Sequence, residues 1–306
     1  MSTLVVGSVA LDSVETPFGK AEDALGGSAI YFSAAASYFA PVRLVGVVGE
    51  DFPRDKLDFM ARRNVDLSGL VVEKGKTFRW GGKYGFDLNT RETLFTDLNV
   101  FENFQPVIPA EYKNSKYIFL ANIEPELQLE VLKQIDSPKL VALDTMNFWI
   151  EGSLPALRET LGVVDVLIIN DSEARQLVQE PNLVKAVKCI NEMGPKIIII
   201  KKGEHGALMI TQDSFFWAPA YPLEFIYDPT GAGDAFAGGF MGYLAKTDDL
   251  SQQNLRRAVI FGSTLASFCV EKLSLERLKD LSHEEIRHRF QGFWNMTNFD
   301  HKNSRF

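Results

Sequence analysis

The sequence has little of what would place it in several large classes of protein. Among its 306 residues only two are cysteines, Cys189 and Cys269, and they show no paired spacing. This argues for a reducing compartment and against a structural zinc site. No stretch approaches the roughly 18 apolar residues of a membrane span. The N-terminus, MSTLVVGSVALD, lacks the basic start of a signal peptide. We therefore expect a cytoplasmic protein that has no membrane partner.

Positive charge is also limited. The chain has 32 Lys and Arg residues against 40 Asp and Glu residues, which leaves a net charge of −8. No Lys/Arg stripe stands out, so nothing predicts a nucleic-acid partner. Neither low-complexity sequence nor a repeat of about 20–50 residues is visible. A chain of this length can bury a sizeable core without disulfides, and we expect a single domain over residues 1–306.

Short apolar runs rich in Val, Ile and Leu recur along the chain, with lengths typical of strands buried on both faces. They lie at 4–10, 42–49, 117–123, 139–144, 164–170 and 196–203. Amphipathic stretches with helical spacing separate most of them, at 28–39, 53–64, 126–135, 173–178 and 183–193. This alternation predicts an α/β fold, a three-layer α/β/α sandwich around a mostly parallel central sheet.

One segment, at about 69–104, breaks the alternation. Its two-residue periodicity, interrupted by Gly and Asn, predicts short strands joined by turns. We interpret it, with part of 12–25, as a small β-sheet lid beside the main sheet. The alternative is an edge hairpin of the main sheet itself. The aromatic side chains of this segment suit a cover over a site, and they are Phe78, Trp80, Tyr84 and Phe86.

A glycine-rich motif, DPTGAGDAFAGGF, occupies residues 228–240. Gly231, Ala232 and Gly233 precede a predicted helix, whose free N–H groups and dipole attract an anion such as a phosphate. The motif is no P-loop, because no Lys-Ser/Thr pair follows the glycines, and it lacks the third glycine of a dinucleotide fingerprint.

The acid that follows, Asp234, would lie in the first turn of that helix. A carboxylate beside a phosphate makes sense if a substrate hydroxyl lies between them. Asp234 would accept the hydroxyl proton while the oxygen attacks the γ-phosphoryl group, and residues 231–233 would form an anion hole. The alternative is that Asp234 only complements the helix dipole.

The 228–240 motif resembles the C-terminal signature of the PfkB-type carbohydrate kinases, the ribokinase-like family. Further segments resemble that family in the same order, and they are Asp12, Gly26-Gly27, VGEDF at 48–52, NVD at 64–66 and NDSE at 170–173. The resemblance implies an α/β sandwich with a β lid, ATP as phosphate donor, and Mg²⁺. It also implies, in many members, a monovalent cation such as K⁺ near Asp228. A homodimer formed through the lid is a further expectation.

On the donor side, Asn170 and Glu173 follow an apolar strand and open a helix. Their spacing also fits a capping box, which is the structural alternative, and both roles can hold at once. Their oxygen atoms suit Mg²⁺, directly or through its waters, and the resemblance adds an ATP contact for Asn170. In the loop KKGEHG, the resemblance implies that Gly203, Gly206 and Lys201 contact ATP. The alternative for this loop is a solvated β-turn.

On the acceptor side, the resemblance assigns Asp12, Gly26 and Gly27 to the binding of substrate hydroxyls. Asn147 fits a sugar-kinase D-x-N stretch loosely, and Arg79 or Arg91 would bind a sugar phosphate. Tyr31 stands where family members commonly carry Asn, which speaks against plain ribose or fructose.

Aromatic residues suggest what the acceptor is instead. Phe78, Trp80, Phe86 and Trp149 would stack on a base or ring, unless they form the lid's own core. Phe268 and the 266–274 loop would wall the adenine or belong to the core. We expect an ATP-dependent kinase that phosphorylates a primary hydroxyl of a small sugar, polyol or nucleoside. The alternatives are a dedicated nucleoside kinase, a non-catalytic ligand sensor on the same fold and, more distantly, a nucleotide hydrolase.

Overall fold

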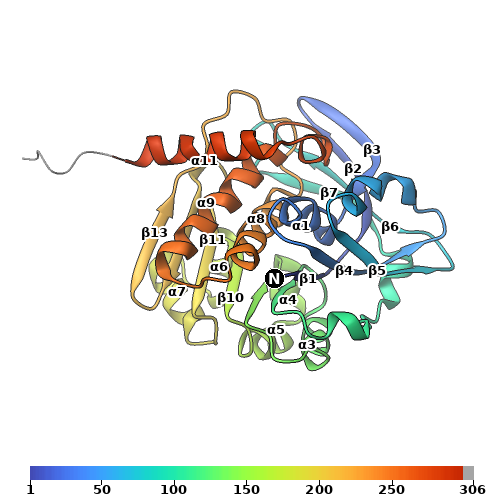
Figure 1. Cartoon of the computed structure of the whole chain (residues 1–306), viewed down its shortest axis with the longest axis horizontal. Coiled ribbons are helices and arrows are strands. Elements are labelled where there is room, and N and C mark those ends of the chain that lie inside the picture. The colour runs from blue at the N-terminus through green and yellow to red at the C-terminus, as the bar shows by residue number, and fades with distance from the viewer. Residues whose placement is uncertain (299–306) are drawn as a thin grey trace, which may run out of the picture.

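The computed structural model describes residues 1–298. Within that range the main sheet has nine strands in the order β13-β12-β11-β10-β9-β8-β1-β4-β5 (Figure 1). Their bounds are β1 (Thr3–Val6), β4 (Val42–Gly49), β5 (Val65–Glu73), β8 (Tyr117–Leu120), β9 (Leu140–Leu143), β10 (Val166–Asn170), β11 (Ile197–Lys201), β12 (Ala207–Thr211) and β13 (Ser214–Ala218). All pairings are parallel except those of β12 with β11 and with β13. The sequence predicted this mostly parallel sheet correctly.

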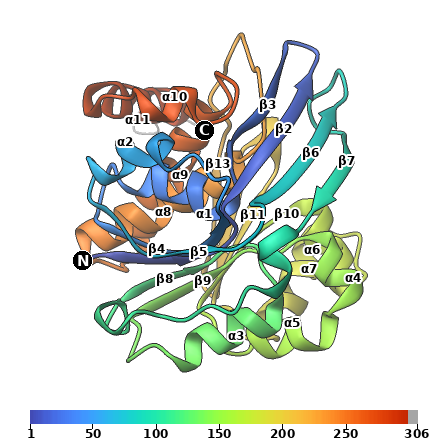
Figure 2. The ribbon, with the colours of Figure 1, turned by 90° about the vertical axis from the view of Figure 1, so that its right-hand side faces the viewer.

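Helices cover both faces of the main sheet, as Figure 2 shows. One face carries α1 (Ser28–Ala36), α2 (Asp58–Ala61), α8 (Ala232–Thr247), α9 (Gln252–Cys269), α10 (Glu276–Lys279) and α11 (His283–Thr297). The other carries α3 (Pro125–Lys133), α4 (Asn147–Gly152), α5 (Leu154–Leu161), α6 (Asp171–Val178) and α7 (Leu183–Asn191). No helix within residues 1–298 is long and apolar enough to cross a membrane.

The core divides into two layers because successive strand residues point to opposite faces. In β1, Val5 packs into the cluster beneath α1 and α8, whereas Leu4 and Val6 pack into the cluster on the opposite face. All three side chains are fully buried. This two-sided burial is why the strands appear in the sequence as uninterrupted apolar runs, and it confirms the predicted sandwich.

The first apolar run, at 4–10, is split between two sheets. β1 ends at Val6, and β2 (Ala10–Thr16) belongs to the second sheet. At the bend the chain passes close to its neighbours, because a Cβ added to Gly7 would lie 2.6 Å from Ala121 Cβ. The sequence suggested that Asp12 ends the first strand of the main sheet. Asp12 lies instead within β2, in the second sheet.

The second sheet is the predicted lid, and within residues 1–298 it has four strands in the order β3-β2-β6-β7. β3 (Gly19–Gly26), β6 (Phe78–Tyr84) and β7 (Arg91–Asp97) join β2 in a sheet that rises beside the main sheet (Figure 2). Its extent differs from our prediction, because residues 69–73 belong to β5 at the edge of the main sheet. The lid comprises 10–26 and 78–97.

Candidate active site

The glycine motif forms the N-terminus of α8, as its sequence predicted. Gly231 is the N-cap residue, with φ at 74°, a left-handed conformation that favours glycine. Ala232 and Gly233 begin the helix, and Asp234 lies in its first turn. Their backbone N–H groups precede the first intrahelical hydrogen bond, from Ala235 N to Gly231 O at 2.8 Å, and the Ala232 N–H also donates to Pro229 O at 3.2 Å. The arrangement is suited to hold an anion.

A lysine ammonium group lies against this anion hole. A Cβ added to Gly233 would be 2.8 Å from Lys201 Nζ, and the same nitrogen is 3.3 Å from Asp144 Oδ2. Lys201 ends β11 and Asp144 follows β9, so the parallel order of the strands brings both to one edge of the sheet. The predicted ATP contact at Lys201 therefore sits at the centre of the site.

Several acids share this one ammonium group. Burial would lower the pKa of Lys201, but three nearby carboxylates raise it above its ordinary value. They belong to Asp144, Glu173 and Asp234. Lys201 is thus charged at neutral pH and balances part of the negative charge in the site.

The predicted general base is poised close to neutral pH. Burial, with help from the Asp144 charge, raises the pKa of Asp234 from 3.8 to about 7, while Lys201 opposes the shift. Burial likewise raises the pKa of Glu173 to about 7. A base is most effective when its pKa lies near the working pH, so the environment of Asp234 suits proton transfer.

The capping box at Asn170 and Glu173 is formed in full. Asn170 Oδ1 accepts from the Glu173 N–H at 2.8 Å, and Glu173 Oε2 accepts from the Asn170 N–H at the same distance. Among the described residues, no hydrogen bond uses the other carboxylate oxygen of Glu173, which leaves it available to a hydrated Mg²⁺. Residues 1–298 contain no cluster of three or more His, Cys, Asp or Glu arranged to hold a metal ion.

The loop after β11 has the backbone that its glycines allow. Gly203 and Gly206 have positive φ angles of 52° and 88°. Lys202 pairs with Asp171 at 3.2 Å, and His205 is solvent-exposed, so neither faces the anion hole. The loop also meets the lid, because a Cβ on Gly203 would be 3.1 Å from Asn89 Oδ1, in the turn between β6 and β7.

The acceptor side is organised around Asp12. A Cβ on Gly26 would be 1.9 Å from Asp12 Oδ2, so only glycine allows this approach. Burial raises the pKa of Asp12 to about 7, partly offset by a hydrogen bond from the Gly27 backbone. The charges of Asp228 and Asp234 raise it further. Asp12 therefore lies within electrostatic reach of the base, as a residue that orients the acceptor should.

The lid is closed over these groups. Tyr84 Oη lies 3.2 Å from Thr230 Oγ1, one residue before the anion hole. Arg91 pairs with Tyr84 across β6 and β7, and its guanidinium lies 5.1 Å above the Trp80 ring. Burial is the largest influence on the pKa of Asp12 and of Glu173, and the positive charge of the exposed Arg91 opposes it in both.

Other sequence candidates do not converge on this site. Arg79 is held by Asp23 at 3.1 Å and Asp51 at 2.8 Å, so the lid arginine that faces the site is Arg91. Asn147 is exposed at the start of α4, three residues after Asp144.

The expected stacking aromatics are largely engaged elsewhere. Phe78 stacks on Phe101 at 5.2 Å, and Phe86 is 90% exposed at the lid tip. Trp149 donates to Asn122 at 2.9 Å. Phe268 is buried beneath Arg289, whose guanidinium is 3.4 Å from the ring centroid, so it belongs to the core and not to an open adenine wall. Trp80, under Arg91, is the aromatic residue that remains beside the site.

Tyr31 lies beneath the anion hole. Only 1% of its surface is exposed, and its ring contacts Gly231 from α1. This differs from the open acceptor subsite that we expected for it, because the side chain runs under α8 and offers no face to a ligand.

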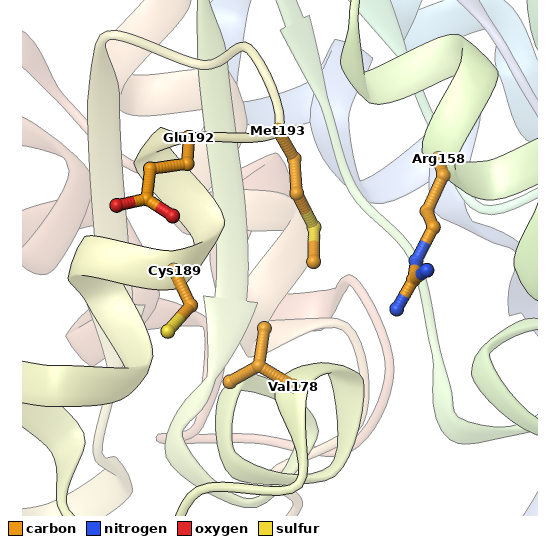
Figure 3. A pocket seen from close by; sticks show the side chains of 5 residues that line it. All are labelled: Arg158, Val178, Cys189, Glu192 and Met193. Atoms are coloured by element: carbon orange, nitrogen blue, oxygen red, sulfur yellow. The ribbon is translucent and has the colours of Figure 1, made fainter.

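A separate open pocket of about 490 Å³ lies among α5, α6 and α7 (Figure 3). Its lining contains none of the candidate site residues and consists of Arg158, Val178, Cys189, Glu192 and Met193.

Sequence reasoning undervalued two residues. Asp144 ends a buried apolar run, KLVALD, a signal that marked Asp12 as well. Arg91 carried no comparable local signal, because its position depends on how the β6–β7 hairpin folds over the site. A helix N-terminus that can hold an anion, a buried carboxyl group with a pKa near 7 and a second buried acid suit a phosphotransferase that acts on a hydroxyl group.

Comparison with known proteins agrees with this class. The family model described as pfkB family carbohydrate kinase matches residues 18–279. A cytidine kinase from Thermococcus kodakarensis is 32% identical over 251 residues, covering 79% of this chain and 88% of that protein. A nucleoside kinase from Methanocaldococcus jannaschii is 24% identical over 251 residues, covering 79% of each chain.

The fold has close counterparts among solved structures. The nucleoside kinase of Burkholderia thailandensis, in complex with inosine, superposes with a TM-score of 0.80 at 20% identity, covering 96% of this chain and 99% of that one. The chain belongs to the pfkB family of carbohydrate kinases. It is a kinase that phosphorylates a hydroxyl group, and membership of the family implies ATP and usually Mg²⁺.

Proposed function

We propose that this protein is an ATP- and Mg²⁺-dependent nucleoside kinase that phosphorylates a primary hydroxyl of its acceptor, with cytidine as the first candidate. The observation that carries the proposal is the grouping of Asp12, Asp234 and the anion hole under a closed lid. The similarity to a cytidine kinase over most of both chains supports a nucleoside as the acceptor. Arg79, one of the two arginines expected to bind a sugar phosphate, is already paired with two carboxylates.

Each residue has a defined part in the transfer. Asp12 orients the acceptor hydroxyls, and Asp234 takes the proton of the attacking hydroxyl. The new bond joins the acceptor oxygen to the γ-phosphorus, while the bond to the bridging oxygen of ADP breaks. The N–H groups of residues 231–233 and the Lys201 ammonium stabilise the charge on the phosphoryl oxygens. Mg²⁺, when bound, neutralises charge on the donor phosphates, and Glu173 with Asn170 would hold its water shell.

Two further expectations stay predictions. A cytoplasmic location fits the scarcity of cysteine in the sequence. A homodimer through the lid is favoured by the exposed apolar side chains of β7, including Leu94 and Phe95. Light scattering at several protein concentrations tests the dimer.

An acceptor screen tests the proposed function. ADP formation is measured with cytidine, uridine, adenosine, guanosine, inosine, ribose, fructose, fructose 6-phosphate and myo-inositol, for wild type and for Asp234→Asn. We expect acceptor-dependent ADP with a nucleoside giving the highest kcat/KM, and almost none with the variant. Acceptor-independent ADP would indicate a hydrolase, and a sugar ahead of all nucleosides would indicate a sugar kinase. Binding without ADP would indicate a sensor.

A further inference from the structure

Tyr31 supports the anion hole from below. A Cβ added to Gly231 would lie 2.3–2.4 Å from three atoms of the Tyr31 ring, so the ring face rests directly on Gly231. The helix that carries Tyr31 is fixed against α8 by glycines. Cβ atoms added to Gly238 and Gly242 would lie 2.3 and 2.8 Å from backbone oxygens of α1. The ring therefore has little freedom to move away from Gly231, whose left-handed backbone directs the anion-hole N–H groups.

The hydroxyl end of Tyr31 reaches the neighbourhood of Asp228. It is buried and has no hydrogen-bond partner among residues 1–298. Burial, and the nearby charges of Asp12 and Asp228, raise the pKa of Tyr31 well above its ordinary value. The side chain is thus neutral, and its ring fills the space against Gly231.

The oxygen atoms around Asp228 already accept hydrogen bonds from the protein. Asp228 Oδ1 accepts from the Thr230 N–H and Oδ2 from the Ser274 N–H, both at 2.9 Å. The Thr230 carbonyl accepts from Cys269 Sγ at 3.6 Å. A hard cation needs several oxygen atoms directed at one common position. Here each of these oxygens spends a lone pair on a protein donor, so the residues present fit the monovalent cation that the sequence predicted at Asp228 only poorly.

We propose that Tyr31 is a positioning residue that, with these direct hydrogen bonds, holds the anion hole in shape without a monovalent cation. The inference rests on the proposed function only in that the transfer uses this anion hole. Two features make a cation dispensable. The ring occupies the space under Gly231, and Lys201 already supplies a positive charge against Gly233.

The first test is a cation exchange at constant ionic strength. Wild-type kcat is measured in tetramethylammonium chloride, which is too large for a small oxygen-lined site, and in KCl. We expect a change of less than about twofold, and a tenfold activation by K⁺ would overturn the proposal.

The thermal midpoint in the same two salts needs no acceptor. A cation present at about 100 times its Kd would raise the midpoint by several degrees, and we expect no K⁺-specific rise. If the protein lacks nucleoside kinase activity and its thermal midpoint shows no K⁺-specific rise, only the proposed function is contradicted. A K⁺-specific rise contradicts only the inference drawn here.

The second test compares two buried aromatic residues of the same helix. Tyr31→Leu removes the ring beneath Gly231, whereas Phe32→Leu removes a ring stacked on Phe119 at 4.5 Å, away from the anion hole. Both should lower the thermal midpoint. We expect Tyr31→Leu to lower kcat about tenfold or more, with the KM for cytidine within about threefold, while Phe32→Leu keeps kcat within about twofold. Tyr31→Phe keeps the ring and should restore kcat.

Two results would overturn the positioning role. Equal kcat losses in Tyr31→Leu and Phe32→Leu would make Tyr31 an ordinary core residue. A rise in KM without a loss of kcat would make it an acceptor contact. If Tyr31→Leu does not fold, Tyr31→Phe and the cation exchange still decide the question, because a tenfold loss in Tyr31→Phe would assign the effect to the hydroxyl and not to the ring.

Discussion

Lys201 Nζ lies 3.3 Å from Asp144 Oδ2 and rests against Gly233 of the anion hole. The pair joins the ends of β9 and β11 across β10, and so links the frame of the sheet to the place where charge develops during phosphoryl transfer. The ion pair is thus expected to contribute to stability, and the Lys201 charge to catalysis, and substitutions can separate these two effects.

Lys201→Met should lower both stability and kcat. Breaking a fully buried pair costs about 3–5 kcal/mol because one charge is left unpaired. The cost is smaller here because the Lys201 side chain is 20% exposed. Adding Asp144→Asn to this variant removes the stranded charge and should restore part of the thermal midpoint, but not kcat. A double variant no more stable than Lys201→Met would show that the pair does not account for the stability loss.

Asp234→Asn should fold and bind ATP normally while kcat falls by roughly 10²–10⁴-fold, the usual contribution of a positioned base. The amide preserves the shape and removes the proton acceptor. Isothermal titration with a non-hydrolysable ATP analogue provides the binding control. A variant that keeps more than about a third of wild-type kcat, with chemistry rate-limiting, would show that Asp234 is not the base.

Glu173→Gln should raise the Mg²⁺ concentration needed for half-maximal activity more than it lowers the thermal midpoint. The amide keeps an oxygen that can accept from the Asn170 N–H, as Oε2 does now at 2.8 Å. It removes the charge that a hydrated cation would feel. Ser282 and Glu285 form a matched capping box at the start of α11, so Glu285→Gln is the capping control, although it also weakens the Arg277–Glu285 ion pair at 2.7 Å. Equal effects of the two variants on the Mg²⁺ titration would reduce Glu173 to a cap.

The sequence was sufficient for the parts of this protein that depend on local pattern. Buried parallel strands have uninterrupted apolar sequences, so β4 could be bounded in advance as 42–49. The anion hole was evident because its glycines and Asp234 are contiguous. The split between β1 and β2 was not evident, because Val9 and Ala10 are as apolar as the strand before them, and only tertiary packing makes the chain leave the main sheet and begin β2 at Ala10.

Contacts between side chains that are far apart in the sequence could not be predicted either. Arg79 and Arg91 both lie on lid strands, and nothing local indicates which one is paired with carboxylates. Tyr31 lies within an apolar helical segment, and nothing in that segment indicates that its ring contacts Gly231, 200 residues later in the chain. Such contacts depend on how the lid and α1 pack against α8, which no single segment specifies.

The two lid arginines should respond differently to truncation. Arg91→Met removes a positive charge that lowers the pKa of both Asp12 and Glu173, and it should lower kcat/KM by more than tenfold, through kcat as well as KM. Arg79→Met breaks ion pairs with Asp23 and Asp51 at the outer part of the lid and should affect mainly the thermal midpoint. Steady-state kinetics and thermal unfolding of both variants check this. The assignment is wrong if Arg79→Met impairs kcat/KM as much as Arg91→Met does.

The raised pKa of Asp234 predicts opposite trends for activity and stability. With a pKa of about 7, the carboxyl is protonated in acid, so kcat/KM should increase with pH up to about pH 7 and level off above it. The folded state binds this proton more tightly than the unfolded chain, whose pKa is near 3.8. The contribution of Asp234 to the free energy of unfolding is therefore fully present below about pH 4 and is lost as the pH rises to about 7.

Asp234→Asn removes that proton linkage, so its thermal midpoint should exceed that of wild type more at pH 8 than at pH 4.5. Differential scanning fluorimetry of both proteins at the two pH values provides the comparison. Glu285→Gln serves as the pH control, because hydrogen bonds from Arg277 and Ser282 lower the pKa of Glu285 to about 2 and give it the opposite sign. A difference between Asp234→Asn and wild type that stays constant with pH would show that burial does not raise the pKa of this carboxyl.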